Sequence, residues 1–263
     1  SRQQIAEAIR TVYGDRITAI YDKSSQTLPF KANLGAVDGY LWGTSDHTSQ
    51  VVLEHGEQFL VNWEKGQKTG FFLDQRENRE LVKRYAKGRT VLNTFCYTGG
   101  FSLALLKGGA EEVVSVDSSE EALEMAKANA ARNGFAGKAE WVCEDVFSCL
   151  RRLRDAGEHF DLVILDPPKF ASSHYHVERA ARAYKDINLN GLRLLQPGGE
   201  LFTFSCSGAI DVDLFQKIVA GAVIDSGLNA WATGRFGAGA DHPLLMTCPE
   251  GEYLKGMRLA VRP

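Results

Sequence analysis

The sequence has no run of eighteen apolar residues, which is about the length that a helix needs to cross a bilayer. Its first residues are polar and follow a helical pattern, without the basic stretch and apolar block of an export signal. Neither pattern of membrane insertion is therefore present. We expect a soluble, cytoplasmic protein with no membrane partner.

Metal-binding patterns are also missing. The five cysteines are odd in number and scattered, and no two of them have the two-residue spacing of zinc or thioredoxin-like sites. We expect reduced thiols and no metal site. The cysteines are Cys96, Cys143, Cys149, Cys206 and Cys248.

An excess of positive charge is absent as well, because the formal net charge is -3. Affinity for nucleic acid comes mainly from lysine and arginine contacts to phosphates. This composition argues mildly against an RNA-binding protein. Any RNA-binding surface must be local, or supplied by a segment that this chain lacks.

The 263 residues are 44% hydrophobic, enough for one large core and a smaller appended domain. From Arg89 onward, short apolar runs alternate with helical patterns, which is typical of a parallel sheet in an α/β fold. We predict a Rossmann-like domain over 89–263, preceded by a small α+β domain over 1–88. The seven predicted strands are Thr90–Asn93, Glu112–Asp117, Ala139–Cys143, Asp161–Asp166, Glu200–Ser205, Asn229–Phe236 and Tyr253–Val261.

Local signals refine this layout. Ser118 and Glu121 have the spacing of a helix capping box, and Gly134 can end that helix in a left-handed conformation. No crossover helix separates the last two strands, which predicts an antiparallel hairpin at one edge of the sheet.

A cofactor site is predicted at the carboxyl edge of this sheet. The loop after the first strand ends in Thr98, Gly99 and Gly100, and its backbone can approach a ligand closely. Asp117 ends the second strand, where a carboxylate can accept ribose hydroxyls, and Asp145 follows the third. Each acid could also be a helix cap. A single glycine pair in place of G-x-G-x-x-G favours S-adenosylmethionine over a dinucleotide.

The fourth and fifth strands carry the predicted chemistry. Asp166 is followed by two prolines, then by Lys169 and Phe170, and this Asp-Pro-Pro loop is typical of methyltransferases that act on planar nitrogen-containing groups. Cys206 follows the next strand. Carbon 5 of a pyrimidine is a poor nucleophile until a thiolate adds to carbon 6, so a cysteine here favours carbon methylation.

At these positions the chain resembles bacterial methyltransferases of the RlmI type, which make 5-methylcytosine in large-subunit (23S) ribosomal RNA. The resemblance covers nearly the whole chain. It rests on KTGFFLDQREN (68–78), NTFCYTGGF (93–101), SVDSS (115–119), LDPPKF (165–170), YKDIN (184–188), FSCSG (204–208), ADHP (240–243) and PEGEYLKG (249–256).

The resemblance implies roles for individual residues. Cys206 would be the attacking thiol, with Asp166 holding the polar edge of the base, Phe170 stacking on it in part and Lys169 orienting the base or meeting the RNA backbone. Lys169 stands where related cytosine-5 enzymes often carry a second cysteine, so the group that removes the carbon 5 proton is left open. The candidates for binding S-adenosylmethionine are Gln75, Arg76, Asn93, Phe95, Thr98, Gly99, Gly100, Asp117, Asp145 and Asp166.

The resemblance also implies partners and alternatives. Large-subunit ribosomal RNA is the expected substrate, and a homodimer is left open. Relatives of this type begin with a small RNA-binding PUA domain that we do not find, so we expect either a piece of a longer protein or a naturally short relative. Two alternative functions stay open: methylation of a guanine ring nitrogen in RNA, and RNA binding without catalysis.

Overall fold

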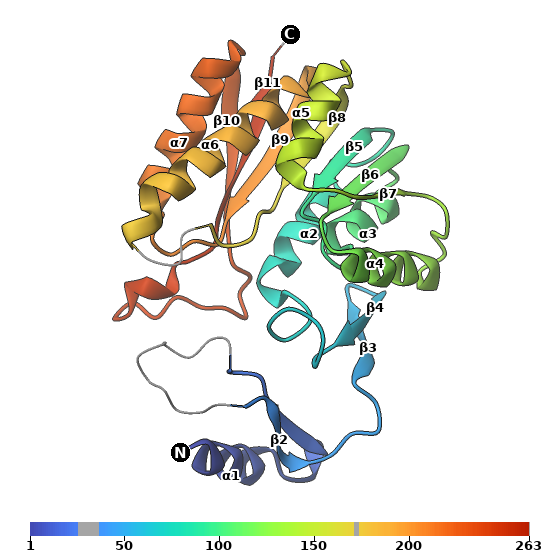
Figure 1. Ribbon diagram of the computed structural model, residues 1–263, viewed down its shortest axis with the longest axis vertical. Coiled ribbons are helices and arrows are strands. Elements are labelled where there is room, and N and C mark those ends of the chain that lie inside the picture. The colour runs from blue at the N-terminus through green and yellow to red at the C-terminus, as the bar shows by residue number, and fades with distance from the viewer. Residues whose placement is uncertain (26–36, 171–173, 263) are drawn as a thin grey trace. The chain divides into compact units, whose positions relative to one another are not determined.

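The computed structural model describes residues 1–25, 37–170 and 174–262 (Figure 1). Its contacts divide the chain into two compact units. Unit 1 comprises residues 1–52 and 59–72, and unit 2 comprises residues 53–58 and 73–263. The sequence placed a boundary near residue 88, whereas this division falls after residue 72 and groups the segment 73–88 with the larger unit.

Unit 1 is a small α+β unit. Ser1 begins its helix with a capping box, because the Ser1 side chain accepts from the backbone of Gln4 and the Gln4 side chain accepts from the N-terminus. The rings of Phe59 and Phe71 pack with centroids 4.8 Å apart. The elements that lie wholly or partly in this unit are α1 (Arg2–Tyr13), η1 (Gly14–Arg16), β1 (Ala19–Asp22), β2 (Gly39–Gly43), β3 (Ser49–Glu54) and β4 (Glu57–Asn62).

A seven-stranded sheet forms the centre of unit 2, in the order β10-β11-β9-β8-β5-β6-β7. The strands are β5 (Thr90–Thr94), β6 (Glu112–Asp117), β7 (Glu140–Cys143), β8 (Phe160–Leu165), β9 (Leu195–Ser205), β10 (Ala230–Gly237) and β11 (Lys255–Val261). The first five are parallel, and β11 runs antiparallel to both β9 and β10. The predicted fold class and the antiparallel hairpin are confirmed.

Helices cover both faces of this sheet (Figure 1). The helical elements are η3 (Leu73–Gln75), α2 (Arg76–Lys83), α3 (Gly100–Lys107), α4 (Glu120–Arg132), α5 (Val146–Asp155), η4 (His174–His176), α6 (Val177–Arg193), α7 (Val212–Ser226) and η5 (Pro249–Gly251). Apolar residues of α2 and α3 pack on one face, and those of α5, α6 and α7 pack on the other. None of the helices that the structure describes is both long and apolar enough to span a membrane.

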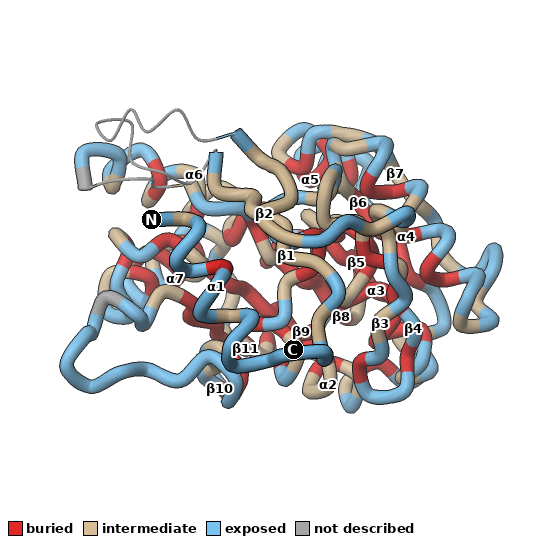
Figure 2. The backbone as a smooth tube through the Cα atoms, turned by 90° about the horizontal axis from the view of Figure 1, so that it is seen from below, coloured by how far each residue is buried: buried red, intermediate tan, exposed pale blue. Residues whose placement is uncertain are grey.

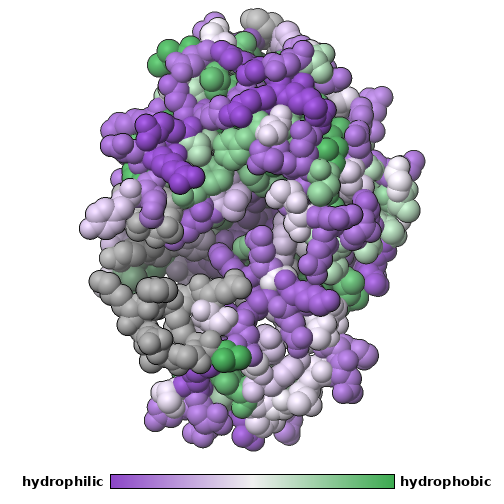
Figure 3. Space-filling model, viewed as in Figure 1, coloured by the Kyte–Doolittle hydropathy of each residue, from purple (hydrophilic) through white to green (hydrophobic). Residues whose placement is uncertain are grey.

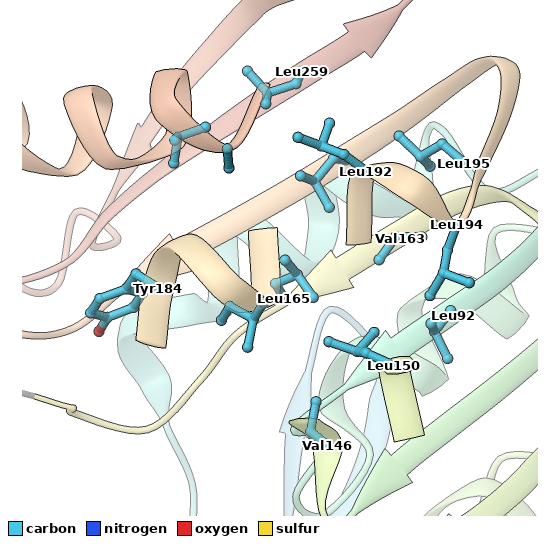
Figure 4. Packing of buried hydrophobic residues seen from close by; sticks show 14 of the residues in the cluster. Leu92, Val146, Leu150, Val163, Leu165, Tyr184, Leu192, Leu194, Leu195 and Leu259 are labelled. Atoms are coloured by element: carbon cyan, nitrogen blue, oxygen red, sulfur yellow. The ribbon is translucent and has the colours of Figure 1, made fainter. Parts of the chain in front are cut away.

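The central strands of unit 2, such as β5 and β8, are largely buried, whereas the outer strands β7 and β10 are not (Figure 2). Figure 4 shows side chains of the larger core cluster, in which Leu150 of α5 lies near the β5 residue Leu92, and Leu165 of β8 lies near α6. Hydrophilic side chains predominate on much of the face shown in Figure 3. Ion pairs on the protein surface include that of Arg151 and Asp186, 2.7 Å apart. The core therefore follows the apolar runs of the sequence.

One local prediction was wrong by a residue. The side chain of Ser119, and not that of Ser118, caps α4 by accepting from the backbone of Ala122. Ser119 is selected because its own backbone donates to Asp117 Oδ1 (2.9 Å), which holds the chain as it enters the helix. The predicted left-handed stop at Gly134 is confirmed by a φ of 83°.

Replacing Leu165 should destabilise unit 2 strongly. Leu165 is fully buried in the larger core cluster, directly before the Asp-Pro-Pro loop. We expect Leu165→Ala to lower the free energy of unfolding by about 2 to 5 kcal/mol, because it leaves a cavity. The control Ile224→Ala, at a side chain that is 78% exposed, should change it by less than about 0.5 kcal/mol. Urea unfolding followed by circular dichroism measures both, and equal losses would contradict the assigned packing.

Candidate active site

Four loops meet at the carboxyl edge of the parallel strands. They follow β5, β6, β8 and β9, whose pairing aligns Thr94 with both Val116 and Leu165, and Leu165 with Thr203. In open α/β sheets this edge is where ligands bind. The loop that contains Gly99 and Gly100, called the glycine loop below, therefore lies at the same edge of the sheet as Asp117, Asp166 and Cys206. We call this edge the rim.

The loop between β5 and α3 is a tight turn. Phe95 and Tyr97 have φ values of 55° and 48°, and Gly99 has a φ of 83°. A left-handed conformation is unfavourable for residues other than glycine and is often found at functional sites. The loop is held by the Asn129 side chain, which donates to the carbonyl of Thr98 (3.0 Å). This hydrogen bond from α4 thus stabilises the shape of the loop.

Asp117 is held by two backbone groups. Its carboxylate accepts from the backbone N–H of Tyr97 and from that of Ser119, both at 2.9 Å. These bonds join the ends of β5 and β6 and orient the carboxylate without neutralising its charge. Asp117 is therefore a preorganised acceptor beside the glycine loop.

Asn93 lies buried beneath the same loop. Its amide nitrogen donates to Ser102 Oγ (2.8 Å), which pairs with Ser115 Oγ (2.8 Å). Its amide oxygen is one of the buried polar atoms without a partner among the described residues. Buried polar atoms usually have a partner, so this oxygen is a candidate acceptor for a ligand.

Asp145 has a structural role in this conformation. It begins α5 and accepts at 3.0 Å from both the backbone N–H and the hydroxyl of Ser148. This is the helix-cap alternative that the sequence left open. Its predicted contact with the cofactor stays a prediction.

Asp166 is hydrogen-bonded to the LDQR motif (73–76), in which Gln75 and Arg76 were predicted to bind the cofactor. Gln75 Nε2 donates to Asp166 Oδ1 (2.8 Å), and Asn78 Nδ2 donates to Gln75 Oε1 (2.6 Å) and to the carbonyl of Gly237 (3.0 Å). Burial raises the pKa of Asp166 to about 7, with a further rise from Asp74, against the opposing effect of the Gln75 amide. A carboxyl in this state can exchange a proton near neutral pH.

The second residue predicted from the LDQR motif, Arg76, contacts the segment that joins β10 and β11. Its guanidinium pairs with Asp241 (2.9 Å) and Glu77 (3.2 Å). Arg79, one helical turn further along α2, packs against the glycine loop instead: a Cβ atom added at Gly100 would lie 3.0 Å from Arg79 Cδ.

The sequence did not reveal the role of Arg79. This arginine is nearly fully buried and forms two hydrogen bonds of 2.6 Å to the equally buried Glu54. The partner lies 25 positions earlier, so no local pattern marks the pair. Because Gly100 has no side chain, the buried side chain of Arg79 can pack directly against the glycine loop and support it.

Cys206 lies against the Asp-Pro-Pro loop. Its Sγ is 3.8 Å from the carbonyl oxygen of Pro167, and the residue is partly exposed. The next residue, Ser207, is buried and pairs through its hydroxyl with that of Tyr184 (3.0 Å). Cys206 is thus not fully buried, and the bond between Ser207 and Tyr184 helps to hold the turn that carries it.

The two residues after the prolines differ in exposure. Lys169 is exposed. The ring of Phe170 packs against those of Tyr184, Phe147 and Phe95, with centroids 4.8, 5.7 and 6.2 Å away. This packing leaves Phe170 only partly accessible to a ligand.

A cavity of about 540 Å³ lies between β10, β11 and the segment that joins them. Its lining includes Tyr253 and Lys255, but no residue of the glycine loop. Tyr253 donates to Asp74 Oδ2 (2.7 Å), and Lys255 donates to the turn after Cys206. The cavity therefore borders the thiol side of the rim.

Comparisons with known proteins agree with this geometry. Residues 29–224 match the family model described as S-adenosylmethionine-dependent methyltransferase. Two curated relatives, both called ribosomal RNA large subunit methyltransferase I, come from Erwinia tasmaniensis and Aeromonas salmonicida. Each is 45% identical to this chain over 99% of its length. The chain spans 65% and 66% of the length of these two relatives.

A solved structure of a methyltransferase complexed with SAH is also similar. It has a TM-score of 0.85 and 26% sequence identity, and the match covers 99% of this chain and 66% of that one. The likeness extends through both units of the chain.

The raised pKa of Asp166 should make stability depend on pH. Its pKa is about 7 in the folded protein against an ordinary 3.8, so the folded state keeps a proton that the unfolded chain releases from about pH 4 upward. The favourable contribution is therefore full below about pH 4 and is lost as the pH rises through about 7. Asp166→Asn removes the titration.

We expect this variant to gain stability relative to the wild type between pH 5 and pH 8, by about 1 to 3 kcal/mol. Urea unfolding at the two pH values measures the difference. The control Asp145→Asn keeps a good helix cap and should show no such gain. A gain for Asp166→Asn that is the same at both pH values would contradict the raised pKa.

Proposed function

Because the chain belongs to the S-adenosylmethionine-dependent methyltransferase family, we propose that it methylates carbon 5 of a cytosine in large-subunit ribosomal RNA through a covalent adduct with Cys206. The family itself was predicted from the sequence and is confirmed. The RNA substrate is supported by the names of the curated relatives. The choice of carbon 5 is supported by the thiol.

The position of Cys206 is the observation that carries this proposal. Its Sγ lies beside the Asp-Pro-Pro loop, and Cys206 directly follows β9, the strand next to β8, which Asp166 directly follows. A buried cysteine is usually only a small apolar residue, but this one is partly exposed at a ligand-binding edge. Methylation of a ring nitrogen needs no such nucleophile.

The rim residues fit the polar groups of S-adenosylmethionine. The cofactor supplies an electrophilic methyl group on its sulfonium. The Asp117 carboxylate is a suitable acceptor for ribose hydroxyls. The unpartnered Asn93 oxygen and the Asp166 carboxylate are suitable acceptors for an ammonium group. The remaining candidates in this role are Gln75, Arg76, Phe95, Thr98, Gly99, Gly100 and Asp145.

The chemistry of the base then involves Cys206 and Asp166. The thiolate forms a bond to carbon 6, and the electron pair of the 5,6 double bond makes carbon 5 nucleophilic. Asp166 can accept from the exocyclic amine, or donate its proton to the ring nitrogen as negative charge develops there. After methylation, carbon 5 loses its proton and the carbon–sulfur bond breaks, returning the electron pair to sulfur.

RNA that carries 5-fluorocytosine should trap the enzyme. Fluorine cannot leave as a cation, so the carbon–sulfur bond persists after methyl transfer. We expect wild-type protein and S-adenosylmethionine to give a band of RNA–protein adduct on a denaturing gel. Cys206→Ala should give none, whereas Cys248→Ala, at an exposed cysteine, should match the wild type. Methylated product without any adduct would favour the guanine alternative.

Asp117 should contribute strongly to cofactor binding. Removing an ionised hydrogen-bond acceptor typically costs about 1.5 to 3 kcal/mol, so Asp117→Ala should raise the Kd for S-adenosylmethionine by about 10-fold or more. Isothermal titration measures this, with circular dichroism to confirm folding. The control Asp155→Ala, at an exposed side chain on α5, should bind as the wild type does. An unchanged Kd for Asp117→Ala would remove Asp117 from the site.

A further inference from the structure

A buried lysine lies behind the turn that carries Cys206. Lys255 begins β11, opposite Ser205 of β9, and is only 4% exposed. Its Nζ donates to the carbonyl of Ser207 (2.9 Å) and to that of Ile210. Both carbonyls belong to the residues that directly follow Cys206. The ammonium group therefore holds this turn together from the side of the cavity.

Within the part of the chain that the structure describes, no carboxylate lies within ion-pair distance of Lys255. Among the described residues, its only hydrogen bonds are to the two carbonyls, which are neutral. Burial lowers the pKa of Lys255, and the negative charges of Cys206, Asp211 and Glu252 act against this decrease. A buried ammonium is costly unless a negative group shares its environment.

The two phenols beside the turn, Tyr184 and Tyr253, stay neutral near pH 7. Burial raises the pKa of Tyr184 to about 12, and burial with the carboxylate of Asp74 raises that of Tyr253. Neither phenol therefore adds a negative charge beside the thiol at neutral pH. The negative groups that act on Lys255 are then Cys206, Asp211 and Glu252.

We propose that Lys255 is a positioning residue for Cys206, which holds the turn after the thiol in place and stabilises the thiolate through its positive charge. The inference rests on the proposed function, because a thiolate at position 206 matters to catalysis only if this sulfur attacks the base. It adds a residue on β11, far from Cys206 in sequence, to the catalytic arrangement.

The test is the pH dependence of alkylation at Cys206. Full-length protein without ligands is treated with iodoacetamide from pH 5.5 to 10, and each cysteine is followed by peptide mass spectrometry. Cys143 and Cys248 are exposed and serve as references within the same molecule. Because only the thiolate reacts, the midpoint of the profile reports its formation.

Two variants separate charge from hydrogen bonding. Lys255→Met removes both, and Lys255→Gln keeps a donor for the carbonyls without the charge. We expect both to move the Cys206 midpoint upward by at least about one pH unit, a roughly tenfold loss of rate near pH 7. Lys255→Arg should restore most of the rate, and Lys217→Met, which removes an exposed lysine of α7, should leave it unchanged.

The outcomes distinguish the two proposals. A Cys206 midpoint that stays in place in folded Lys255→Gln would overturn the role of the charge, even if the maximum rate changes through loosening of the turn. If Lys255→Met does not fold, the comparison of Lys255→Gln with Lys255→Arg decides. Failure of the wild type to form the 5-fluorocytosine adduct would reject the cytosine mechanism, whereas a shifted midpoint would still establish the effect of Lys255 on the thiol.

Discussion

Parallel hydrogen bonding among β5, β6, β8 and β9 is the constraint on which the site depends. It sets Thr94 opposite Leu165 and Leu165 opposite Thr203, so that the loops after these strands begin at nearly the same level. A slip of one residue would turn every side chain of a strand to the other face and bury polar groups in a helix interface. The fully buried side chains of the strands, Leu165 among them, therefore also determine where the reactive groups lie.

Uncharged partners hold the charged groups of the rim. Backbone N–H groups hold Asp117, the Gln75 amide holds Asp166, and backbone carbonyls hold Lys255. Such partners fix the position of a charge without cancelling it, so the charge stays available to a ligand. The contrast is the pair of Arg79 and Glu54, where two opposite charges neutralise each other behind the glycine loop. A charge with neutral partners is suited to binding a ligand, whereas a buried ion pair is suited to supporting the loop.

The sequence predicted the features that depend on local patterns. Six of the seven strands lie within two residues of their predicted bounds, because apolar runs separated by helical periodicity leave few alternatives. The exception is β9, which begins at Leu195, five residues before the predicted start at Glu200. The cap of α4 was wrong by one residue, since two adjacent serines carry the same signal and only the bond from Ser119 to Asp117 separates them. The roles of Arg79 and Lys255 were missed because, from sequence alone, a charged residue is expected to lie in solvent unless its partner is known. Their partners lie 25 and more than 40 positions away.

Asp166 and Cys206, which directly follow the neighbouring strands β8 and β9, need opposite protonation states in the proposed mechanism. Asp166 is most useful to an electron-rich base while it keeps a proton, and its pKa of about 7 allows that. Cys206 is useful only after it has lost one. A negative Asp166 would also oppose a thiolate on the adjacent strand, so a proton on the carboxyl favours the reactive form of the thiol. Lys255, behind the turn, acts in the same direction without competing for the base, because its ammonium points to backbone carbonyls. In the proposed mechanism, the transferable proton of Asp166 and the fixed positive charge of Lys255 would let one edge of the sheet support both nucleophilic attack and proton donation.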